Sequence, residues 1–153
     1  MFIFYIPYMK YKLCNLLVLS SLLFFIPIYI FIKKIIYHKK SANLFEYLLA
    51  TLLFFNIMIS MHFWCEGGRN SIPHYIDGIF AKLSMLLVML YVIFFKKLHL
   101  FYIFSFLFVL SCIYFFTHYS NKFSSTNWGC EDHIFYHSMF HICGSIGASF
   151  AFF

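Results

Sequence analysis

Long apolar runs alternate with short polar links along the chain. A helix needs about 20 mostly apolar residues to cross the hydrocarbon core of a bilayer. Five runs reach this length, and they cover residues 13–32, 44–64, 73–95, 98–117 and 133–153. The pattern predicts an all-α fold, a polytopic membrane helix bundle with about five transmembrane helices in a single domain over residues 1–153. Pro27 should kink the first helix, because proline removes a backbone hydrogen bond.

The composition supports this interpretation. The 153 residues are 63% hydrophobic and 10% charged, whereas about a quarter of the residues of a soluble domain are charged. These values exclude a soluble globular domain and indicate an integral membrane protein. The net charge of +6 is best explained by membrane topology and by contact with lipid headgroups. We therefore expect membrane lipids, and no nucleic acid, as partners.

Five spans would place successive links on alternating faces of the membrane. The first face takes the amino terminus and links 65–72 and 118–132, and the second takes links 33–43 and 96–97 with the carboxyl terminus. Basic residues split into four on the first face (Lys10, Lys12, Arg69, Lys122) and six on the second (Lys33, Lys34, Lys39, Lys40, Lys96, Lys97). The positive-inside rule then puts the second face in the cytosol. The first face would be lumenal or extracellular, in an endomembrane (ER or Golgi) or the plasma membrane.

The other polar residues gather at the first face. Its acidic residues are Glu66, Asp77, Glu131 and Asp132, and only Glu46 belongs to the second face. Six of the eight histidines also belong to the first face: His62, His74, His118, His133, His137 and His141. In a chain with so few polar residues, this segregation is the strongest functional signal.

Three of these histidines share one helix face. His133, His137 and His141 follow one another at spacings of four, so a helix places them in one stripe. Neutral imidazoles on one face are what a metal site requires. The alternative is that they form hydrogen bonds to neighbouring helices or line an interface.

Depth brings residues of three helices together. At 1.5 Å per residue, His62, Asp77, His137 and His141 all lie a short way below the first face. Three imidazoles and an open position are the composition of a catalytic zinc site, and a carboxylate beside it could take the proton of the bound water. The alternative is that Asp77 pairs with Lys82 or merely marks the membrane interface.

Three motifs resemble a known superfamily. They are Ser60-Met61-His62-Phe63-Trp64-Cys65-Glu66, Tyr75-Ile76-Asp77-Gly78-Ile79-Phe80-Ala81 and Tyr136-His137-Ser138-Met139-Phe140-His141. The superfamily groups alkaline ceramidases, adiponectin-receptor-type proteins, GPI-remodelling phospholipases and myomaker-like proteins, and the last motif is most similar to the myomaker-like branch. The resemblance implies that His62, His137 and His141 hold zinc, that Asp77 holds the zinc-bound water, and that Ser60 lines the site as a second catalytic residue.

Two departures from the family pattern matter. The family places its serine four residues before the histidine, whereas Ser60 is two residues before His62; two residues turn a helix by about 200°, so both cannot point inward. The family also has seven core helices, and five spans would leave the bundle open on one flank. A truncated member, a degenerate copy, an oligomer or a missing helical partner would each explain that.

Cys65 and Cys130 lie beside the motifs on the first face. If that face is lumenal, a disulfide between them would clamp the site; two unrelated thiols are the alternative.

The leading hypothesis is a membrane-embedded, zinc-dependent hydrolase of a lipid amide or ester, ceramidase-like or GPI-lipid-remodelling-like. The first alternative is a non-catalytic myomaker-like or structural multispanning protein. The second is a haem-binding membrane subunit with His62 and His141 as axial ligands.

Overall fold

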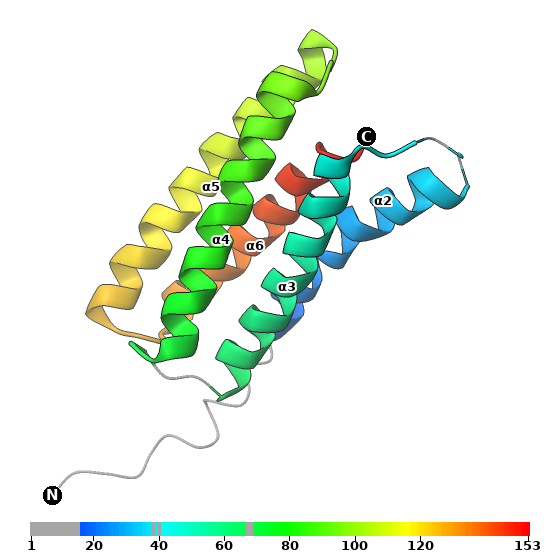
Figure 1. Ribbon diagram of the computed structural model, residues 1–153. Helices are drawn as coiled ribbons and strands as arrows, with labels where there is room; N and C mark the ends of the chain where they lie inside the picture. The colour runs from blue at the N-terminus through cyan, green and yellow to red at the C-terminus, as the bar shows by residue number, and fades with distance from the viewer. Residues whose placement is uncertain (1–15, 38, 40, 67–68) are drawn as a thin grey trace, which may run out of the picture.

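The computed structural model describes residues 16–37, 39, 41–66 and 69–153 (Figure 1). Within these ranges the chain forms helices and no strand, which confirms the predicted all-α helix bundle. The elements are α2 (Phe25–Ile36), α3 (Leu44–Glu66), α4 (Ile72–Leu90), the π-helical turn η1 (Tyr91–Phe95), α5 (Leu100–Thr126) and α6 (Glu131–Ser149). Residues 16–22 are also helical and precede α2. Lys10, Lys12 and Lys40, which enter the topology argument, lie outside the described residues.

Four of the predicted runs form helices that are long and apolar enough to cross a membrane. They are Leu16–Ile36, Leu44–Cys65, Ile72–Phe95 and Leu100–Thr126. Their outer faces carry large exposed hydrophobic side chains, such as Phe101, Phe104 and Phe108 of α5. These faces suit contact with lipid chains, which identifies the protein as an integral membrane protein.

The fifth predicted run forms α6, which lies in the middle of the bundle (Figure 1). It is not among the helices that qualify as spans by their own composition. Its buried residues include His133, Ser138, His141, Ser145 and Ser149. The polar side chains of α6 therefore face protein neighbours rather than lipid.

Helix α5 extends past the predicted end at residue 117 and stops at Thr126. No glycine or proline interrupts this sequence until Gly129, where the backbone has a φ of 80°. Most of the predicted link 118–132 is therefore helical, because that stretch carries no residue that breaks a helix.

Pro27 interrupts the first span as predicted. The helix breaks at a turn over Leu23 and Phe24 before α2 begins. Proline at position 27 cannot donate to the carbonyl of Leu23, and the Ser145 hydroxyl of α6 donates to that carbonyl instead, at 2.7 Å. The break also lets the Phe24 ring pack closely on α6 at Gly144.

A buried ionic cluster closes the end of the bundle that holds link 37–43, link 96–99 and the carboxyl end of α6. The Glu46 carboxylate accepts hydrogen bonds from Lys34 at 2.6 and 2.7 Å, from Lys96 at 3.0 Å and from the Tyr91 hydroxyl at 3.1 Å. Lys96 also donates to the Ala151 carbonyl at 2.9 Å. One carboxylate thus connects α2, α3, η1 and the segment after α6.

Candidate functional site

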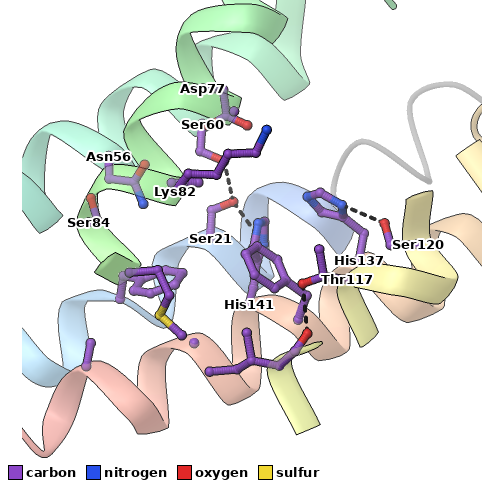
Figure 2. A pocket seen from close by; sticks show the side chains of 18 of the residues that line it. Ser21, Asn56, Ser60, Asp77, Lys82, Ser84, Thr117, Ser120, His137 and His141 are labelled. Atoms are coloured by element: carbon purple, nitrogen blue, oxygen red, sulfur yellow. Dashed lines mark hydrogen bonds between the residues drawn. The ribbon is translucent and has the colours of Figure 1, made fainter. Parts of the chain in front are cut away.

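The opposite end of the bundle contains a cavity of about 610 Å³ between α3, α4, α5 and α6. Its volume lies within the range of roughly 300–1,000 Å³ that is usual for small-molecule sites. Its polar lining includes Ser21, Ser60, Asp77, His137 and His141, which come from four helical segments (Figure 2). The structure thus brings together four of the five residues that the sequence predicted for the site.

A hydrogen-bonded chain connects His141 to α3. The Ser20 hydroxyl lies 2.8 Å from Nδ1 of His141, and the Ser21 hydroxyl lies 3.3 Å from the same atom. Ser21 is in turn 3.1 Å from the Ser60 hydroxyl, and the Asp77 side chain lies beside Ser60 (Figure 2). The first helix therefore contributes to the site through residues that the sequence analysis did not select.

The hydrogen bonds of Ser20 and Ser21 indicate which nitrogen of His141 carries its hydrogen. Ser20 and Ser21 both donate to the carbonyl of Leu17, at 2.9 and 2.8 Å. A hydroxyl has one hydrogen to donate, so with both hydrogens on that carbonyl the two oxygen atoms accept from the ring. We therefore assign the hydrogen of neutral His141 to Nδ1, which leaves a free lone pair on Nε2.

His137 lies one turn before His141. Its Nδ1 is 3.0 Å from the Ser120 hydroxyl of α5, and its ring centroid is 4.7 Å from that of His141. Trp64 of α3 packs edge-on against the same ring, with the centroids 5.0 Å apart. A serine of α5 and a tryptophan of α3 thus hold His137 in place.

Two further histidines line the cavity. Nδ1 of His133 accepts a hydrogen bond from the Gly129 backbone at 3.1 Å, and Nδ1 of His74 accepts one from the Asn70 backbone at 3.1 Å. In the neutral ring the hydrogen must then be on Nε2. Nε2 of His133 and of His74 therefore carries a hydrogen, whereas Nε2 of His141 carries a free lone pair. Both rings pack against Trp128, with centroids 4.7 and 5.1 Å away.

The predicted histidine stripe therefore forms, with different roles along it. His133, His137 and His141 all lie on α6 and all line the cavity. His133 accepts from the Gly129 backbone, whereas His137 and His141 form hydrogen bonds to serines of neighbouring helices. Hydrogen bonding to neighbouring helices is the alternative that the sequence analysis left open for these residues.

His62 lies elsewhere. Its side chain is exposed and lines a separate, shallow pocket with Met58, Ile59, Pro73 and Ile76. Ser60, by contrast, is buried and lines the main cavity. The conflict between these two positions is resolved in favour of Ser60, because a step of two residues places the side chains on nearly opposite faces of α3. His62 and His141 also share no cavity in the described chain, so the haem pocket finds no support.

Trp64 occupies the place where the family pattern puts its third imidazole. It is four residues after Ser60 and therefore on the same face of α3, and it contacts His137. Among the described residues, no group of three or more His, Cys, Asp or Glu side chains is arranged to hold a metal ion. The residues present do not fit the three-histidine zinc site that the resemblance implies.

Asp77 is buried, with 8% of its surface exposed, and no ion pair joins it to Lys82 in the part of the chain that the structure describes.

Cys65 and Cys130 are free thiols, and the Cys130 sulfur caps α6 by accepting from the His133 backbone at 3.4 Å. The disulfide considered from the sequence is therefore not formed.

The sequence analysis missed Ser20, Ser21 and Ser120. Two adjacent serines inside an otherwise apolar span were the available signal, because a hydroxyl in a span needs a partner inside the protein.

Comparison of the chain with protein-family models, with curated proteins and with solved structures finds no match.

Proposed function

We propose that this protein is an intramembrane hydrolase of a lipid ester or amide. The observation that carries the proposal is the convergence of Ser60, Asp77, His137 and His141 on one cavity that is otherwise lined mainly by apolar side chains. An acyl chain would occupy the apolar part, and the scissile carbonyl would lie at the polar end. The motifs that contain these residues resemble a superfamily that includes alkaline ceramidases and GPI-remodelling phospholipases, which supports this choice.

The chain's own residues provide groups for such a reaction. Asp77 is the acidic side chain among the described residues that line the cavity, and it would accept the proton of the attacking water. His141, held by Ser20 and Ser21, offers an unprotonated Nε2 as an acceptor, and His137 adds a second imidazole beside it. No step of the proposal is routed through a metal.

Hydrolysis by the purified protein in liposomes tests the proposal. The release of fatty acid from a panel of ester and amide lipids is measured for the wild type, Asp77→Asn and His141→Gln. His62→Ala is the matched control, because His62 is exposed and outside the cavity. Activity that survives in His62→Ala and falls by about 10²-fold or more in the other two variants supports the proposal. A folded wild-type protein that releases no fatty acid from any lipid contradicts it.

The second candidate function is a non-catalytic, myomaker-like or structural membrane protein. The position of Trp64 favours it, since an indole fills the place of an imidazole and packs on His137. This candidate predicts that the wild type stays inactive on every lipid while its folding still depends on the buried hydrogen bonds of His141. Thermal unfolding of His141→Gln, compared with that of the wild type and of His62→Ala, tests whether His141 stabilises the fold.

A further inference from the structure

Lys82 places a positive charge inside the membrane-spanning part of the protein. It follows the start of α4 at Ile72 by ten residues, which is about 15 Å along the helix. Helical side chains lean towards the amino-terminal end, and α4 begins at the polar end of the cavity. Figure 2 accordingly draws the Lys82 amine among Ser60, Asp77 and His137. The ammonium group thus lies at the same level as the candidate catalytic residues.

Among the described side chains, no carboxylate forms an ion pair with Lys82. Asp77 and Lys82 are the formally charged residues among the described side chains that line the cavity, and they form no ion pair with each other. A charged side chain within a span is costly and is usually paired or used by a ligand. An anionic ligand in the cavity would satisfy Lys82.

A second polar group in the cavity also lacks a partner. Oδ1 of Asn56 is buried and accepts no hydrogen bond from the described residues, and Asn56 is 6% exposed. It lines the same cavity from α3, one helical turn from Ser60 (Figure 2). A buried acceptor without a donor is unfavourable by about 1–3 kcal/mol. A ligand with a hydroxyl or amide hydrogen beside its anionic group would satisfy Asn56 as well.

The walls of the cavity suit an acyl chain that arrives from the bilayer. Helices α4 and α5 barely contact each other, whereas α4 packs on α3 and α5 packs on α6. Apolar side chains from both helices line the space between them, including Met85 and Leu86 of α4 and Leu110 and Ile113 of α5. This seam offers a chain-like molecule a path that does not cross the polar end.

We propose that the cavity binds a single-chain lipid whose anionic oxygen atoms pair with Lys82. The acyl chain lies between α4 and α5, and the anionic group is either a carboxylate or a phosphate. The inference names the lipid class for the proposed hydrolase and rests on that function only in calling the lipid a substrate or product. Binding itself requires no hydrolysis, so the two proposals fail independently.

The protein carries its own reporter for this site. Trp64 and Trp128 both line the cavity, and the chain has two tryptophans. Bromine atoms on an acyl chain quench tryptophan fluorescence on contact. The protein is reconstituted in nanodiscs of neutral lipid and titrated with three probes that share one dibrominated C18 chain: the free fatty acid, the lysophosphatidic acid and the neutral monoacylglycerol.

For the wild type we expect half-maximal quenching by at least one anionic probe at about five- to tenfold lower concentration than by the neutral probe. Preference for the fatty acid identifies a carboxylate ligand, and preference for the lysophosphatidic acid identifies a phosphate. Lys82→Gln should remove the preference and Lys82→Arg should keep it. Lys97→Gln, which changes an exposed lysine in a link, is the matched control and should behave as the wild type.

A variant that fills the cavity tests whether the probes bind there. An added Cβ at Gly78 would meet nothing within 4 Å, and Gly78 lines the cavity, so a side chain can start there without a clash and Gly78→Leu should block quenching by all three probes. Equal quenching by charged and neutral probes in the wild type would overturn the proposal. So would an anionic preference that persists in Lys82→Gln, or quenching that Gly78→Leu leaves unchanged.

Discussion

The hydroxyl of Ser20 lies 2.8 Å from Nδ1 of His141, although 121 positions separate the two residues in the chain. With the Ser20 hydrogen on the Leu17 carbonyl, at 2.9 Å, the ring donates to the serine. The contact therefore fixes both the orientation of the imidazole and the nitrogen that carries its hydrogen. It also joins the first helix to α6 at the polar end of the cavity.

This contact predicts opposite tautomers for two histidines of one helix. In ¹⁵N NMR spectra of labelled protein, neutral His141 should carry its hydrogen on Nδ1, and neutral His133, which accepts from the Gly129 backbone, should carry it on Nε2. The double variant Ser20→Ala/Ser21→Ala should remove the preference at His141 and leave that of His133 unchanged. An Nε2–H tautomer for His141 in the wild type would contradict the assignment.

Substitution of Trp64 by histidine should complete a three-imidazole metal site. Trp64→His would place a third imidazole on the Ser60 face of α3, next to His137, and three imidazoles are a sufficient protein ligand set for zinc. We expect this variant to bind about one zinc per chain, and more tightly than the wild type by at least about tenfold. Elemental analysis and titration with a competing chelator measure the difference.

Two controls accompany that experiment. Trp64→Phe removes the indole without adding a ligand and should leave zinc binding as in the wild type. His62→Ala should have no effect on zinc content, because His62 is exposed on the other side of α3. A full complement of zinc in the wild type that disappears in His62→Ala would instead restore the ligand set first inferred from the sequence.

The sequence predicts where the helices lie, but it says less about which side of each helix faces the protein interior. Apolar runs of about 20 residues predict spans because the bilayer imposes that length, and the i, i+4 spacing predicts the stripe on α6. The choice between Ser60 and His62 was different. A membrane helix meets apolar surroundings on its lipid face and on its protein face, so the pattern of α3 does not indicate which side is inward.

The roles of individual polar groups were equally beyond the sequence. Ser20 and Ser21 matter because the break before Pro27 and the packing of Phe24 on Gly144 bring them to His141. The two lysines paired with Glu46 come from α2 and from the link after η1, and they meet only once the helices have assembled. Such contacts depend on tertiary distances that no local spacing encodes.

Gly144 and Gly78 form a matched pair for testing the packing at the break. A Cβ at Gly144 would lie 2.9 Å from Cζ of Phe24, whereas a Cβ at Gly78 would meet nothing within 4 Å. We expect Gly144→Leu to destabilise the protein by about 1–3 kcal/mol through overpacking. Gly78→Ala should be neutral or stabilise α4 by up to about 1 kcal/mol. Thermal unfolding in detergent compares the two variants. Equal melting temperatures would show that the Phe24 ring moves aside without loss of stability.

Removal of the Glu46 charge should weaken the end of the bundle opposite the cavity. Glu46→Gln leaves Lys34 and Lys96 without the carboxylate that neutralises both, and breaking a buried pair from one side typically costs about 3–5 kcal/mol. We expect a lower melting temperature and faster proteolysis of link 37–43. Lys97→Gln, next to Lys96 but exposed, is the control. Unchanged unfolding of Glu46→Gln would indicate that the lysines reach water.

The polar character of α6 has a consequence for how the protein is made. Leu100–Thr126 and the spans before it are apolar enough to enter lipid on their own composition, but α6 carries buried His133, His141 and several serines. Such a segment partitions poorly into a bare bilayer. It leaves the ribosome after the other helices, so they must still be gathered at the insertion site to receive it. Insertion of α6 and assembly of the cavity are therefore a single event in the biogenesis of this protein.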